Sequence, residues 1–83
     1  MGYIDEKYGI KSSKSLEKYI HKITAKEVIV IKMADNLRII WALGDKLHTY
    51  DIKAHVIYCV KEEELNEAVD FILNSINENL KNK

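Results

Sequence analysis

Apolar residues recur at helical spacing in two segments, one near each end of the chain. In the first, "SSKSLEKYIHKI" at residues 12–23, the apolar side chains gather on one face of a helix. The opposite face carries Lys14, Lys18 and Lys22. Ser12 or Ser13 can accept a hydrogen bond from a backbone N–H group and so cap the start of this helix. The pattern predicts a capped amphipathic helix.

The second segment, "KEEELNEAVDFILNSINENL" at residues 61–80, has one apolar stripe that runs from Leu65 to Ile76. Three glutamates, Glu62 to Glu64, lie in its first turn, where carboxylates favour the positive end of the helix dipole. Phe71 falls off the stripe. We expect either the N-terminal segment to cover it or a partner to bind it.

Two continuous apolar runs lie between these helices, "VIVI" at residues 28–31 and "HVIYCV" at residues 55–60. Neither alternates polar with apolar residues, which is typical of strands buried on both faces of a parallel sheet. We therefore predict parallel strands over residues 27–33 and 53–60.

Residues 36–50 decide the fold class. As a strand, the segment places Leu37, Ile39, Trp41 and Leu43 on one face, but its other face then carries only one polar residue. As a helix it separates polar from apolar residues better, and Asp35 can cap it. Gly44 opposes the helix by about 1 kcal/mol. The prediction is an α/β fold, α-β-α-β-α, with a helical crossover; the alternative is an α+β fold with an antiparallel β-meander between helices.

Length and composition limit what the chain can be. Its 83 residues allow one domain over residues 1–83, and 47% hydrophobic with 31% charged residues is typical of a globular protein. The longest apolar runs are too short to span a bilayer, so no membrane association is expected. A single cysteine and the lack of a signal-peptide pattern indicate the cytoplasm.

Charge suggests one candidate surface. The net charge is zero, but lysines recur every three or four residues from Lys11 to Lys26 along the first predicted helix. A row of this kind suits a line of phosphates, although a solvated helix face explains it equally well. The sequence therefore suggests an RNA site that includes Lys14, Lys18 and Lys22.

Two stretches resemble the small kink-turn RNA-binding ribosomal proteins. These are "SSKSLEKYIHKITAKEVIVIKMAD" at residues 12–35 and "IKAHVIYCVKEEELNEA" at residues 52–68. The resemblance implies an α/β fold with a crossover helix, and structured RNA as the partner. By position it assigns RNA contacts to Ser12, Ser13, Lys14 and Ser15, and then to Val60 and Lys61. This chain departs from the family at Ser12, where the family has glycine, and in the acidic residues after Lys61.

No arrangement of residues in the sequence indicates catalysis. Three histidines (His21, His48 and His55) and Cys59 lack the paired spacing of a metal site, and a buried structural cysteine is the simpler explanation for Cys59. No glycine-rich phosphate loop is present, since the three glycines are scattered. We expect no enzymatic activity, metal or cofactor.

Two functions remain as hypotheses. One is a small RNA-binding protein that contacts phosphates through the first helix and its N-terminus. The other is a protein-interaction module, acting as a homodimer or an adaptor, with Trp41 and Phe71 in the interface.

Overall fold

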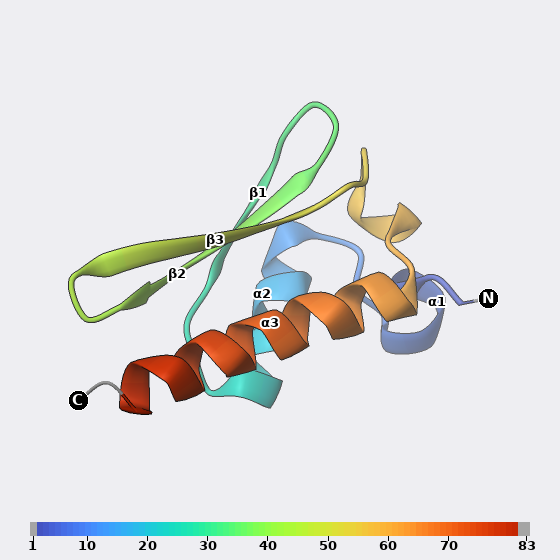
Figure 1. Cartoon of the computed structure of the whole chain (residues 1–83). Coiled ribbons are helices and arrows are strands. Elements are labelled where there is room, and N and C mark those ends of the chain that lie inside the picture. Colours follow the sequence, from blue (N-terminus) through green and yellow to red (C-terminus); the bar gives the residue numbers. More distant parts are fainter. Residues whose placement is uncertain (1, 82–83) are drawn as a thin grey trace.

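A computed structural model describes residues 2–81 and contains a layer of helices beneath a three-stranded sheet (Figure 1). The elements in chain order are α1 (Ile4–Tyr8), α2 (Ser13–Thr24), β1 (Ile29–Lys32), β2 (Leu37–Leu43), β3 (Lys46–Ile52), the 3-10 helix η1 (Ile57–Cys59) and α3 (Glu62–Lys81). The sheet is antiparallel throughout, in the order β1-β2-β3. The α+β alternative, helix–β-meander–helix, is therefore confirmed.

Both predicted amphipathic helices are confirmed. Ser12 caps α2 by accepting a hydrogen bond from the Ser15 N–H, while the Ser15 hydroxyl accepts one from the Ser12 N–H. This reciprocal pair satisfies two backbone donors that a helix start leaves free. The buried residues lie on the predicted faces, with Leu16 and Ile20 inside in α2 and Leu65 and Ile72 inside in α3. Ile23, at the end of the predicted apolar face of α2, is instead 43% exposed.

The predicted crossover helix over residues 36–50 is wrong, and so is the parallel pairing. The strand predicted over residues 27–33 is present as β1, but it pairs antiparallel with β2. The segment predicted as the crossover helix forms β2 and β3, which pair from Leu37↔Ile52 to Leu43↔Lys46 around a turn at Gly44 and Asp45. Gly44 has φ of 65°, whereas Asp45 is not among the residues with positive φ. Positive φ at only the first central residue, occupied by glycine, is the pattern of a type II′ hairpin turn. Gly44 thus favours the hairpin that connects two strands, rather than merely weakening a helix.

The alternation in residues 37–43 marks a strand with one buried face. Leu37, Ile39, Trp41 and Leu43 are at most 7% exposed and point toward the helices. The sequence pattern favoured a helix over this strand because Ile40 and Ala42, on the strand's other face, are apolar. The structure leaves that second face uncovered by the described part of the chain, so its apolar residues are a surface feature.

The strand predicted over residues 53–60 is also wrong. Its apolar run becomes the short helix η1, with Ile57 and Val60 buried and Tyr58 exposed. Near the N-terminus, α1 is joined to the start of α3 by a single bridge, Tyr3↔Lys61. Within the run, Ile57 and Val60, three residues apart, reach the core from this short helix and its C-terminal end.

The core lies between the inner face of the sheet and helices α2 and α3. Trp41 is 2% exposed, and its indole N–H donates to the Ser75 hydroxyl at 3.0 Å. Ser75 in turn donates to the Ile72 carbonyl in α3. The hydrogen bond satisfies the one polar atom of the largest buried side chain, so it fixes β2 against α3 without an unpaired donor.

We expect Gly44→Ala to lower the free energy of unfolding by about 1–2 kcal/mol, because an L-residue is strained at positive φ. A Cβ there meets no atom within 4 Å, so strain rather than collision is the cause. In the rejected helix the same change would add about 1 kcal/mol of stability. Urea unfolding measures the sign, and Gly2→Ala, also in open space, is the matched control. A stabilised G44A variant would contradict the hairpin.

Candidate interaction surface

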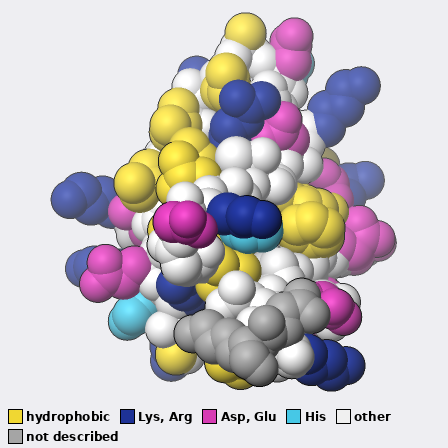
Figure 2. All heavy atoms as spheres, turned by 60° about the vertical axis from the view of Figure 1, so that its left-hand side comes forward, with side chains coloured by type: hydrophobic (Ala, Val, Ile, Leu, Met, Phe, Trp, Pro, Cys, Tyr) yellow, Lys and Arg dark blue, Asp and Glu magenta, His cyan; other side chains and the backbone are white. Residues whose placement is uncertain are grey.

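The outer face of the sheet, which points away from the helices, is largely apolar. Ile29 is 57% exposed and pairs with Ile40, while Leu47 is 73% exposed and pairs with Ala42. Ile31, two residues further along β1 on the same face, is 44% exposed. We call these five residues the outer-face patch. Figure 2, which brings the hairpin end of the molecule forward, shows hydrophobic side chains gathered in a band at the surface.

One ion pair lies beside this patch. Arg38 donates two hydrogen bonds to the Asp51 carboxylate across the β2–β3 ladder, at 2.9 and 3.1 Å. The hydrogen bonds from Arg38 lower the pKa of Asp51, and the same contacts raise the pKa of Arg38. The charges are paired with each other, so they add no net charge to the patch.

A groove of about 480 Å³ runs along the patch where β1 leaves the sheet. The last β1–β2 pair is Ile29↔Ile40, whereas β2 continues as far as Leu43. The chain from Ala25 to Val28 forms the opposite wall, and Ala42 and Leu47 line the groove on the hairpin side. The β2–β3 hairpin therefore projects beyond the end of the β1–β2 pairing (Figure 1) and forms one wall of the groove.

The two edges of the sheet differ. The outward N–H of Val30 in β1 donates to the Glu17 carboxylate of α2 at 2.9 Å. In β3 the pair Leu43↔Lys46 closes the two-residue turn, so the bonded partners of β2 are Lys46 and every second residue after it. The intervening residues direct their N–H and C=O groups away from the sheet. Within residues 2–81 these outward groups of Leu47, Thr49 and Asp51 form no hydrogen bond.

An aromatic cluster lies under the β3 edge. Trp41 stacks on His48 with ring centroids 5.9 Å apart, and Phe71 of α3 contacts Trp41 edge-on at 6.0 Å and Tyr50 at 5.0 Å. Phe71 is 45% exposed, whereas Trp41 lies in the core. The placement of Trp41 and Phe71 in an interface stays a prediction, and of the two only Phe71 presents surface to a partner.

The structure brings together three of the residues predicted to bind nucleic acid. Lys14, Lys18 and Lys22 are all exposed on α2. Ser15 is occupied as a cap, since its hydroxyl accepts from two backbone N–H groups, and Ser13 is the first residue of the helix. Lys61 is exposed on a different element, just before α3.

The titratable residues considered for metal binding are dispersed. His48 is on β3, His55 follows the sheet, and Cys59 is exposed rather than buried, which corrects the expectation for that cysteine. His55 Nδ1 lies 3.1 Å from the Ala34 carbonyl oxygen in the β1–β2 loop. Among residues 2–81 no three such side chains converge as a metal site would require. None of the helices in this part of the chain has the length and apolar composition to cross a bilayer.

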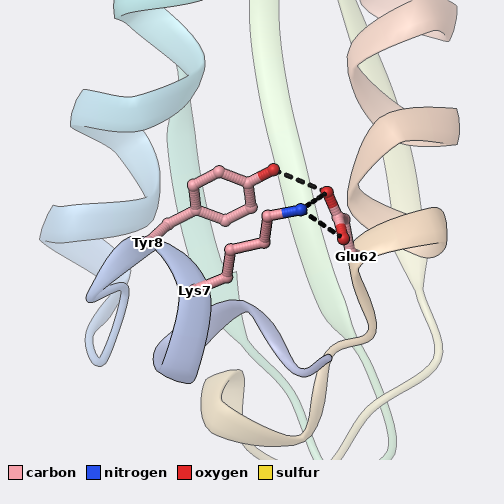
Figure 3. Close-up of polar contacts among 3 residues, drawn as sticks. All are labelled: Lys7, Tyr8 and Glu62. Atoms are coloured by element: carbon pink, nitrogen blue, oxygen red, sulfur yellow. Dashed lines mark hydrogen bonds and ion pairs between the residues drawn. The ribbon is translucent and has the colours of Figure 1, made fainter. Parts of the chain in front are cut away.

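The strongest polar cluster joins α1 to α3. The Tyr8 hydroxyl donates to the Glu62 carboxylate at 2.7 Å, and the Lys7 ammonium does so at 2.9 Å (Figure 3). The hydrogen bond raises the pKa of Tyr8 to about 12, and the bonds from Tyr8 and Lys7 lower the pKa of Glu62. Each group satisfies another in the cluster, so we interpret it as a structural clamp between two helices.

Sequence reasoning missed most of the outer-face patch and the free β3 edge. Two signals pointed to them. The face of residues 37–43 with only one polar residue marked the patch, and the dipeptide Gly44–Asp45 marked the two-residue turn. Together these signals indicate a hairpin with two apolar faces, of which the helices cover one.

Comparison with known proteins gives no family. No protein-family model, curated protein or solved structure matches this chain. The resemblance to kink-turn RNA-binding proteins stays untested, although the crossover helix that it implied is replaced by the β2–β3 hairpin.

We expect acid to destabilise the native chain through Glu62. A carboxyl group whose pKa is lowered on folding stabilises the protein above its ordinary value, 4.5 here, and loses this contribution as the pH falls through its folded-state pKa. The native chain should therefore be more stable than the Glu62→Gln variant above pH 4.5, and this difference in the stability of the two chains should shrink as the pH falls below 4.5. Thermal unfolding across that range measures the difference. Glu63→Gln, an exposed neighbour, is the control; identical profiles for both variants would contradict the clamp.

Proposed function

We propose that the chain is a non-enzymatic protein-interaction module that binds the apolar surface of a protein partner on the outer face of its sheet. The observation that carries the proposal is the outer-face patch, where Ile29, Ile31 and Leu47 are each more than two-fifths exposed. On folded soluble proteins, contiguous exposed apolar patches mark interaction sites. A two-layer domain with an apolar second face has room for a third layer supplied by another chain.

The charges near the patch define the partner's chemistry. Arg38 and Asp51 neutralise each other, and the patch itself carries no charged side chain. A polyanion such as RNA would find no unpaired cation among these residues. An amphipathic segment with a row of aliphatic side chains would bury the patch and could extend into the groove beside Ala42.

Site-specific photo-cross-linking tests the proposal. A photoreactive amino acid at position 31 should give one reproducible adduct with another protein in cells that naturally make this chain. The same label at Asn77, exposed on α3, is the matched control. The protein identified from the adduct, once purified, should bind the native chain at least tenfold more tightly than an Ile29→Glu variant, because a charge would be buried without a partner.

Stability gives the folding control for that experiment. Ile29 is 57% exposed, so I29E should change the free energy of unfolding by less than about 0.5 kcal/mol. Equal labelling at positions 31 and 77, or unchanged binding by I29E, would refute a docking role for the outer face.

RNA binding through α2 is a second candidate, favoured by one observation. Lys14, Lys18 and Lys22 are exposed along one helix whose buried residues face elsewhere. Within residues 2–81 no ion pair joins neighbouring Glu17 to the row, and one of its carboxylate oxygens accepts from the Val30 N–H. Lysines spaced along a helix can follow a phosphate backbone.

Changing Lys14, Lys18 and Lys22 together to Gln should weaken RNA binding for all sequences and reduce the salt slope by roughly 0.7–0.9 per lost contact. Fluorescence anisotropy with a sharply bent RNA and a plain duplex measures both. The control changes Lys32, Lys46 and Lys53, exposed on or beside the sheet, to Gln. No binding at low salt, or equal losses in both triple variants, would exclude an RNA site on α2.

A further inference from the structure

The β3 edge is built to accept another strand. Leu47, Thr49 and Asp51 present free N–H and C=O groups in a row along a seven-residue strand. The opposite edge is treated differently, since α2 packs beside β1 and Glu17 occupies the Val30 N–H. Exposed edges of regular strands pair with other chains unless a charge, bulge or cover prevents it. β3 carries two charged residues: Asp51 is held on the outer face by Arg38, and Lys46 lies at the turn end of the strand, which leaves the edge from Leu47 to Thr49 without a charge.

We propose that a second copy of this chain pairs with β3, antiparallel and related by a two-fold axis at Thr49, to form a continuous six-stranded sheet. This register is the one in which Lys46–Ile52 lies opposite itself over its whole length. It places the free N–H and C=O groups of Leu47 opposite those of Asp51 in the other copy. Thr49 of one copy lies opposite Thr49 of the other. Cross-strand threonine pairs are favourable in antiparallel sheets.

Charge complementarity favours a second copy over an unrelated strand. In the same register Asp45, in the turn, lies opposite Lys53 of the other copy, and the two-fold axis repeats this contact. Lys46 lies opposite Ile52, which lines a hollow with Glu64 and Glu67 of α3. A single chain therefore carries both halves of the complementary pattern, as an interface between identical copies requires.

The aromatic cluster adds apolar contact beneath the seam. His48 and Tyr50 alternate with the free-edge residues on the inner face, so each lies opposite the other across the two-fold axis. Phe71 contacts Tyr50 at 5.0 Å from below and remains 45% exposed. Side-by-side copies would shield these rings from water, which gives the exposed part of Phe71 a partner surface.

The inference uses the edge of the sheet, whereas the proposed function uses its outer face; Leu47 contributes its backbone to the first and its side chain to the second. The outer-face patch binds a partner from above the sheet, whereas β3 extends the sheet sideways. Either can fail alone, because I29E alters the face and leaves the free backbone groups of β3 unchanged.

A charge-swap experiment tests the register. Asp45→Lys and Lys53→Asp each place like charges opposite each other twice, so each variant alone should dimerise about tenfold more weakly than the native chain. Mixed in equal amounts, D45K and K53D restore opposite charges at both contacts of a heterodimer. Sedimentation of the native chain should show a dimer at micromolar concentrations. Sedimentation of the mixture should show the dimer restored to near the native level.

Mixing also controls for folding, because a misfolded variant would not recover by meeting another variant. The matched control reverses the charges of Lys22 and Glu63, which are remote in the sequence from β3, with Lys22→Asp and Glu63→Lys. These variants should leave dimerisation unchanged. A native chain that stays monomeric, or a mixture no more dimeric than its components, would overturn the proposed pairing.

Amide hydrogen exchange identifies the seam directly. The N–H groups of Leu47, Thr49 and Asp51 should exchange at least tenfold more slowly in the dimer than in monomeric D45K. The N–H of Val30, which already donates to Glu17, should change little. A dimer in which the three β3 amides still exchange freely would place the contact elsewhere and contradict an edge-to-edge assembly.

Discussion

Burial of one face of a three-stranded sheet is the constraint on which the rest of the structure depends. Leu37, Ile39, Trp41 and Leu43 of β2 pack onto α2 and α3, and burying each contributes about 1.5–3 kcal/mol. The described chain supplies helices for this face only (Figure 1). Side chains on a strand alternate between faces, so placing these four inward necessarily places Ile40 and Ala42 outward.

The uncovered face and the free β3 edge have the same origin. A short chain with a small core leaves surface that a larger domain would bury with more elements. The β1 edge shows how such surface is closed within the chain, through the Glu17 contact to Val30. A second copy at β3 would close the other edge and place the two outer-face patches on the same face of one sheet, on either side of a seam where Leu47 lies opposite the other copy's Asp51.

Much of the helical layer and the position of β1 could be predicted from the sequence, whereas β2, β3 and the antiparallel pairing could not. Helical periodicity and the serine cap identify α2, and the same periodicity identifies α3, because both signals are local. The strand at residues 37–43 was not predicted, for a physical reason. Its outer face is apolar, which removes the polar alternation that distinguishes a half-buried strand from a buried one. The lysines of the candidate RNA site were readily found, but the patch required knowing which face the helices cover.

The most direct measurement is an isotope-filtered nuclear Overhauser experiment on a mixture of labelled and unlabelled chains. Self-pairing about Thr49 places His48 opposite Tyr50 of the other copy as a non-hydrogen-bonded pair, with Cα atoms about 4.5 Å apart. A strong intermolecular signal between the Hα protons of His48 and Tyr50 is therefore expected. Intermolecular signals confined to Ile29, Ile31 and Leu47, or none in a concentrated sample, would contradict a sheet completed along β3.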